Sequence, residues 1–151
     1  MKSGAGSRGR SRLVCAILLF LLATGCGLKG TRGGIPAEVE SVVGTVTDDV
    51  AEERYDKVYD ESSELWKRDT TKEQSAEVLK TLHSKLGKVE SRTVHSATEQ
   101  QNSGGALKGH AFIITYQTKF EHGEAMETFT LTEENGRWLL ARYLVNSTAL
   151  K

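Results

Sequence analysis

The chain contains few thiols and few helix breakers. Cysteine occurs twice in 151 residues, at Cys15 and Cys26, and proline once, at Pro36. Its longest apolar run is residues 13–23, whereas a permanent transmembrane helix needs about 20 apolar residues. The sequence therefore excludes a framework of several disulfides and argues against a lasting membrane span.

Motifs of enzymes and metal sites are also lacking. The four histidines, His83, His95, His110 and His122, show neither H-x₃-H nor H-E-x-x-H spacing, so a structural zinc is not expected. There is no G-x-S-x-G, no phosphate-binding glycine loop and no Ser/His/Asp arrangement. The sequence thus predicts no catalytic residue, no metal and no cofactor, and it favours a protein that is not an enzyme.

The first 25 residues have the order of an export signal. Four basic residues and no acid precede the apolar run 13–23, and small residues follow it. The segment Ala23-Thr24-Gly25-Cys26 resembles the lipobox of bacterial lipoproteins. This resemblance implies cleavage between Gly25 and Cys26 and acylation of the Cys26 thiol. The alternative is an ordinary secretory signal cut elsewhere, with Cys26 a free thiol.

Acylation would make membrane lipid the first partner of the chain, because two or more acyl chains anchor a protein firmly. Cys15 would be lost with the signal, so no intramolecular disulfide could form. Gly27 stands where aspartate commonly signals inner-membrane retention, which implies the periplasmic face of the outer membrane if the host is Gram-negative. The remaining chain has 16 basic and 20 acidic residues. This mild acidity gives no electrostatic footprint for nucleic acid.

We expect a glycine-rich tether over residues 26–35 and one domain over residues 36–151. Valines at helical spacing from Pro36 to Val50 predict a first helix. Asp49 with Glu52 resembles a capping pair for a second helix that continues past Trp66. Thr71 with Gln74 forms a capping box for a third helix, and Gly87 fits a left-handed cap at its end.

From Lys88 onward the hydrophobic period changes to 2, which predicts strands over residues 88–98, 107–120, 124–133 and 137–147. His122-Gly123 and Asn135-Gly136 mark tight hairpins. The last strand is apolar on both sides, which favours a central or doubly covered position. Helices followed by a four-stranded meander predict an α+β fold with two or three helices on a curved antiparallel sheet.

Three segments, residues 55–63, residues 86–92 and residues 134–138, resemble the nuclear-transport-factor-two-like, or cystatin-like, cone domains found in small bacterial lipoproteins. The resemblance covers about residues 37–147. It implies a shape with a pocket and no particular reaction. The polar and aromatic candidates for such a pocket are Tyr55, Tyr59, His110, Tyr116 and Trp138. Tyrosines at these spacings are also ordinary core aromatics with a solvated hydroxyl.

Two functions follow as hypotheses. The first is a lipid-anchored, non-catalytic domain that binds or scaffolds another component of the cell envelope, with an envelope protein as the candidate partner. The second is a small-ligand carrier or isomerase-like enzyme that uses the interior of the cone. A cavity lined by His110 or by a buried carboxylate would favour the second. An interior filled by large apolar side chains would exclude it; these are Phe112, Ile114, Phe129, Trp138 and Leu140.

Overall fold

A computed structural model describes residues 34–151, which form four helices followed by a four-stranded sheet. The elements, in chain order, are α1 (Ala37–Ala51), α2 (Tyr55–Asp60), α3 (Glu64–Asp69), α4 (Lys72–Leu86), β1 (Val89–Asn102), β2 (Gly109–Phe120), β3 (Gly123–Glu134), β4 (Arg137–Asn146) and the 3₁₀ turn η1 (Thr148–Leu150).

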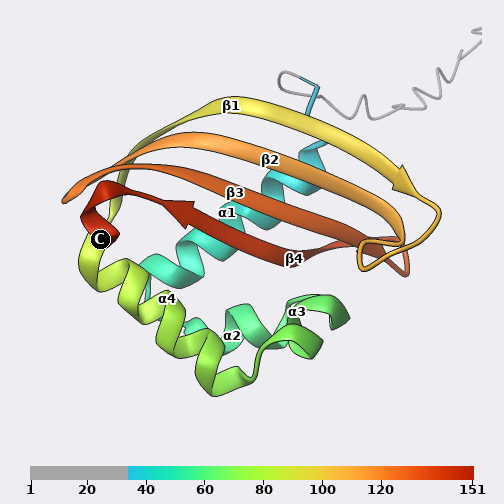
Figure 1. Cartoon of the computed structure of the whole chain (residues 1–151), viewed down its shortest axis with the longest axis horizontal. Helices are drawn as coiled ribbons and strands as arrows, with labels where there is room; N and C mark the ends of the chain where they lie inside the picture. Colours follow the sequence, from blue (N-terminus) through green and yellow to red (C-terminus); the bar gives the residue numbers. More distant parts are fainter. Residues whose placement is uncertain (1–33) are drawn as a thin grey trace, which may run out of the picture.

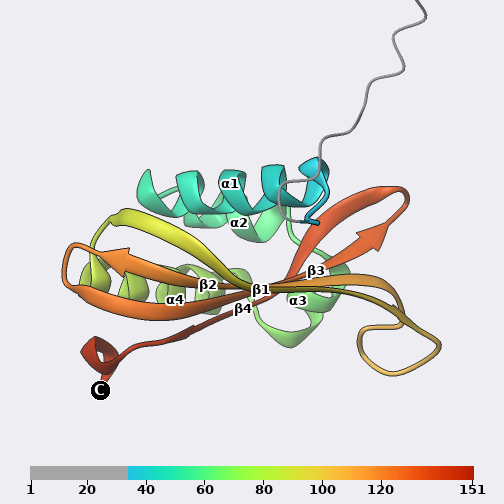
Figure 2. The same cartoon turned by 90° about the horizontal axis from the view of Figure 1, so that it is seen from above.

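The sheet has the order β1-β2-β3-β4 with antiparallel pairing throughout. Its strands arch over the helices (Figure 1). The predicted α+β fold, with N-terminal helices on a curved antiparallel sheet, is therefore confirmed. Figure 2 shows α1 running alongside the sheet and the C-terminal turn at one end of it.

The helix signals at α4 are confirmed. The Thr71 side chain accepts from the Gln74 amide and the Gln74 side chain accepts from the Thr71 amide, a reciprocal capping box. Gly87 ends the helix with φ 74° and ψ −161°, so the predicted positive φ is present although ψ is extended.

The prediction of one continuous second helix was wrong. The chain forms two six-residue helices, α2 and α3, because Ser63 leaves the helical conformation, caps α3 through its side chain and donates its amide to Leu140 O on β4. The prediction that Asp49 and Glu52 form a capping pair was also wrong. Asp49 lies inside α1, where it is buried, and Arg54 precedes α2 without a side-chain cap.

The two hairpins of the β2-β3-β4 meander differ in how well the sequence predicted them. Asn135 and Gly136 have φ of 53° and 74°, as the Asn-Gly turn requires. The other turn consists of Glu121 and His122, because Phe120 pairs with Gly123 at the start of β3. β1 also extends to Asn102, four residues further than predicted.

A bulge in β4 decides which of its residues face the core. The register pairs Thr130 with Arg142 but Leu131 with Leu140, so Ala141 is the extra residue. Trp138 and Leu140 before the bulge therefore share the inner face with Tyr143 and Val145 after it. Leu144 points outward and is 64% exposed. β4 is an edge strand, so the predicted central position was wrong.

The core lies between α1, α4 and the inner face of the sheet. Its fully buried members include Val39, Leu79, Ile114, Phe129 and Leu131. Ile35, which the sequence analysis placed in the tether, is also fully buried in this cluster, so the folded domain begins at least one residue earlier than predicted. None of the helices described after residue 33 is both long and apolar enough to cross a bilayer.

Candidate functional site

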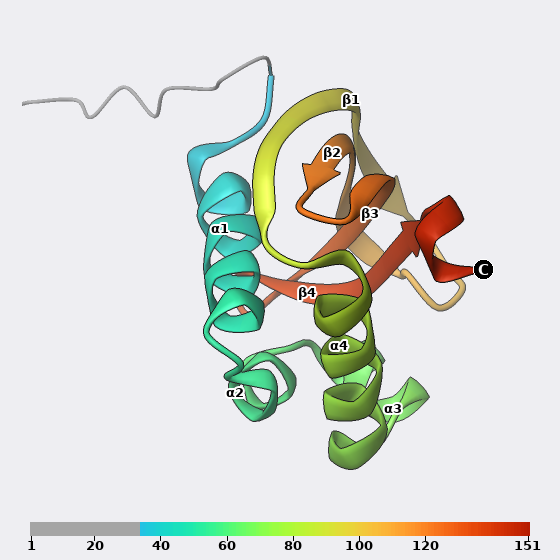
Figure 3. The ribbon, with the colours of Figure 1, turned by 90° about the vertical axis from the view of Figure 1, so that its left-hand side faces the viewer.

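A cavity of about 350 Å³ lies at the end of the sheet where β1 begins. The C-terminal halves of α1 and α4 contribute Val46, Val50, Leu82 and Leu86, and the sheet contributes Arg92, Phe120, Glu127, Phe129 and Tyr143. Figure 3 views the domain from this end, with α1 and α4 on either side of the inner face of the sheet. We call this space the α1–α4 cavity.

A buried ion pair forms part of the cavity wall. Arg92 on β1 reaches Glu127 on β3, with its Nε 2.8 Å and its Nη2 2.7 Å from Glu127 Oε2. Glu127 is 1% exposed, while the Arg92 side chain retains 16% exposure. A buried carboxylate is tolerated only when paired, because isolated charges are strongly disfavoured in a low-dielectric interior.

Three hydroxyl groups complete the network. Tyr143 donates to Glu127 Oε1 at 2.5 Å, and Thr118 donates to Glu127 Oε2. Thr47 on α1 accepts from Arg92 Nη1 at 3.0 Å, which connects the helix to the sheet. The guanidinium also lies over the rings of Tyr116 and Phe129, at 5.2 and 5.5 Å from their centroids.

This environment keeps both nearby phenols protonated. Burial raises the pKa of Tyr143 well above 10, and the adjacent negative charge of Glu127 raises it further. Burial also raises the pKa of Tyr116, partly opposed by the Arg92 cation. Neutral phenols and a carboxylate with three donors are suited to orient and hydrogen-bond a ligand. They are poorly suited to accept a proton from one.

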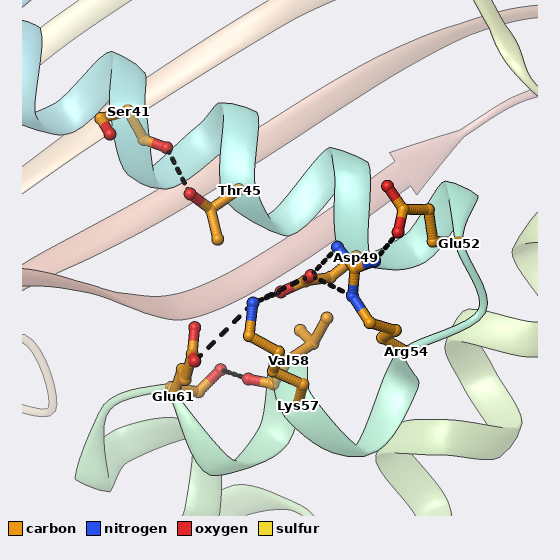
Figure 4. Close-up of polar contacts among 9 residues, drawn as sticks. Ser41, Thr45, Asp49, Glu52, Arg54, Lys57, Val58 and Glu61 are labelled. Atoms are coloured by element: carbon orange, nitrogen blue, oxygen red, sulfur yellow. Dashed lines mark hydrogen bonds and ion pairs between the residues drawn. The ribbon is translucent and has the colours of Figure 1, made fainter.

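The opposite end of the domain contains a larger and more polar cavity of about 550 Å³, between α1, α2 and the β3–β4 hairpin. Buried Asp49 lies on its wall and accepts from Arg54 Nε at 2.8 Å and from Lys57 Nζ at 3.1 Å (Figure 4). The close-up shows both cations reaching back from α2 and its approach to the end of α1. Asp49 thus fixes the angle between these helices, and its carboxylate is fully occupied.

The structure does not bring the five predicted pocket residues together. His110 and Trp138 do meet, with ring centroids 4.7 Å apart, and Trp138 lines the larger cavity. Tyr55 on α2 hydrogen-bonds to His83 at 3.0 Å, Tyr59 is half-buried on the same helix, and Tyr116 is in the core against Phe129. None of the five lines the α1–α4 cavity.

His110 lies between two carboxylates on the inner face of the sheet, in phase with Phe112 on β2. Its Nδ1 is 2.7 Å from Glu133 and its Nε2 is 2.6 Å from Glu99. The hydrogen bond to Glu133 raises the pKa of His110, and the one to Glu99 adds to the increase. Among residues 34–151 no group of three or more His, Cys, Asp or Glu side chains could hold a metal ion.

The sequence analysis did not predict the central pair, Arg92 and Glu127, although the sequence contains a signal for one of them. Glu127 falls in phase with Ala125, Phe129 and Leu131 on a strand of period 2, so a charged residue occupies an apolar face. Such a residue requires a buried cation. Nothing local in the sequence indicates that Arg92, 35 positions earlier, is that cation.

The chain was compared with known protein families. A family model with the description "Protein of unknown function (DUF4019)" matches residues 44–143. The chain belongs to this family. The matched range begins within α1 and ends in β4, so it contains Arg92, Glu127 and Tyr143 of the α1–α4 cavity. No curated protein matches the chain. The predicted signal, Gly25 and Cys26 lie outside the described residues.

Proposed function

We propose that this DUF4019 chain is a membrane-anchored lipoprotein of the cell envelope whose folded domain is a non-catalytic binding domain. The anchor rests on the lipobox-like segment ending at Cys26, and the periplasmic face of the outer membrane is its expected site in a Gram-negative host. We include in this proposal that the folded domain is a nuclear-transport-factor-two-like cone domain, as its sequence resemblance implies.

The state of the buried ionisable groups supports binding over catalysis. Glu127 has three donors and Asp49 has two cationic partners, so each carboxylate is engaged within the described domain. A general base needs a lone pair that is directed at substrate. The α1–α4 cavity is nevertheless open beside a buried carboxylate, and this observation favours a carrier of a small ligand over a purely mechanical scaffold.

The interior is filled at its centre and has a cavity toward each end. Phe112, Ile114 and Leu140 are buried in the main core cluster, as a scaffold would require. The α1–α4 cavity lies between that cluster, which contributes Val46 and Phe129 to its wall, and a separate small cluster that includes Leu86, Val89 and Phe120. A lipid-anchored domain that binds a small molecule accounts for both observations.

The anchor is tested by metabolic labelling with a clickable fatty acid. The unmodified chain should incorporate the label, and Cys26→Ser should abolish it. Cys15→Ser is the matched control, because it removes the other cysteine and should leave labelling unchanged. Equal labelling of the unmodified chain and Cys26→Ser would refute lipidation at this residue.

A further inference from the structure

We propose that the α1–α4 cavity binds a small, uncharged and largely apolar molecule that presents one hydrogen-bond acceptor, such as a carbonyl oxygen, to the guanidinium of Arg92. This inference rests on the proposed binding function of the domain and specifies the chemistry of its ligand.

The first argument concerns donors. A guanidinium carries five N–H groups. Arg92 directs Nε at Glu127 and Thr118, Nη1 at Thr47 and Nη2 at Glu127. One N–H on each Nη therefore lacks a partner among the described residues, and the side chain keeps part of its surface open. An acceptor oxygen in the cavity would satisfy a donor that the protein leaves available.

The second argument concerns charge. Glu127 already neutralises Arg92, and the charged groups on the rim, Asp48 and Lys88, are exposed and of opposite sign. The remaining titratable group of the wall, His83, is hydrogen-bonded to Tyr55 at 3.0 Å. A carboxylate ligand would therefore bring a net negative charge beside the buried Glu127 without a compensating cation. An uncharged carbonyl takes the same hydrogen bond without this cost.

The third argument concerns the rest of the wall. Most of the side chains around the Arg92–Glu127 pair are aliphatic or aromatic, and they come from both helices and all four strands: Val46, Val50, Leu82, Leu86, Val89, Phe120, Phe129 and Tyr143. A volume of about 350 Å³ is at the lower end of the range for small-molecule sites. The body of the ligand should therefore be compact and apolar.

The test uses benzophenone, a neutral diaryl ketone that inserts into nearby C–H bonds on illumination. Full-length chain in its native membranes is illuminated with benzophenone or with 4-benzoylbenzoate, the same photophore carrying a carboxylate. Crosslinked positions are then mapped by peptide mass spectrometry. We expect benzophenone to label peptides that contain Leu82, Leu86 or Val89. The anionic analogue should label them at least about fivefold less at equal concentration.

Two valines of α1 supply a matched pair of variants. Val50→Phe places a ring in the α1–α4 cavity and should reduce labelling of these peptides at least about fivefold. Val42→Phe makes the same change two turns earlier, where the side chain lines the other cavity, and should leave the labelling unchanged. If circular dichroism shows that Val50→Phe is unfolded, Leu82→Phe replaces it as the blocking variant.

Several outcomes would overturn the proposal. Absence of crosslinks from the cavity peptides, or their equal loss in both valine variants, would exclude the α1–α4 cavity as the site. Labelling by 4-benzoylbenzoate as strong as that by benzophenone would refute an uncharged ligand. Failure of the anchor is distinguishable, because fatty-acid labelling of Cys26 and crosslinking in the cavity are separate measurements on the same chain.

Discussion

Tyr143 reaches Glu127 diagonally across the β3–β4 pair. The strand register places Tyr143 directly opposite Phe129 and places Glu127 opposite Val145, so the hydroxyl spans two positions along the inner face to the carboxylate. The Ala141 bulge makes this contact available, because regular pairing of Ala141 with Thr130 would turn Tyr143 outward. One irregular residue in an edge strand thus completes the hydrogen bonding of a buried charge.

We expect Glu127→Gln to lower the free energy of unfolding by about 3–5 kcal/mol, because the substitution leaves the Arg92 cation without its counter-charge. Urea denaturation monitored by circular dichroism measures the change. Glu124→Gln is the matched control on the same strand, and its exposed side chain predicts a change within about 0.5 kcal/mol. Similar losses in the two variants would show that the ion pair contributes nothing particular to stability.

Deleting Ala141 should preserve the inner face of β4 and leave the domain folded. The deletion removes the bulge, and Arg142 then follows Leu140 directly, so Tyr143 and Val145 keep their partners on β3. Deleting Leu144 shortens the strand equally but should unfold the domain, because Val145 would then turn outward. Far-ultraviolet circular dichroism compares the two deletions, and loss of the native spectrum in the Ala141 deletion alone would contradict this account of the strand.

Two glycines should respond oppositely to alanine. Gly44 lies within α1 with open space around it, so Gly44→Ala should stabilise the protein by about 0.5–1 kcal/mol. Gly87 has φ 74°, and a Cβ there would lie 2.8 Å from the Cβ of Glu121, so Gly87→Ala should destabilise it by about 1–2 kcal/mol. Thermal unfolding of both variants compares the signs, and a stabilising Gly87→Ala would contradict the described backbone.

His110 should titrate above its usual pKa of 6.5, because Glu133 and Glu99 favour its protonated form. A raised pKa in the folded state means that the stabilisation is complete below pH 6.5 and is lost as pH rises through the folded-state pKa. NMR titration of the imidazole should give a lower pKa in Glu133→Gln than in the unmodified chain. An unchanged titration midpoint would show that the contact with Glu133 is not maintained in solution.

The sequence predicted the parts of this fold that short-range rules determine. The capping box of Thr71 and Gln74, the Asn135-Gly136 turn and the change of period near Lys88 are local signals, and each was confirmed. The second helix was predicted too long because the break at Ser63 depends on a hydrogen bond from its amide to Leu140 O on β4. No local sequence pattern indicates this contact. The inner face of β4 was ambiguous because a bulge reverses the alternation partway along the strand.

The site was less predictable for the same physical reason. Of the residues proposed from their chemical type, His110 has its partners Glu99 and Glu133 outside the cavity wall, and Tyr55 contacts that wall only through His83. The cavity wall is assembled from Thr47, Arg92 and Glu127, which meet only when α1 packs on the sheet. Residue type alone could not rank these three above other charged and hydroxyl residues, because their burial is a property of the tertiary structure.

The burial of Ile35 sets how far the domain would stand from a bilayer. Only eight residues separate it from Cys26, which in full extension would reach about 30 Å. The α1–α4 cavity lies at the far end of α1, a further 20 Å or so along the helix axis. On the proposed anchor, this reach would let the cavity stand clear of the lipid surface.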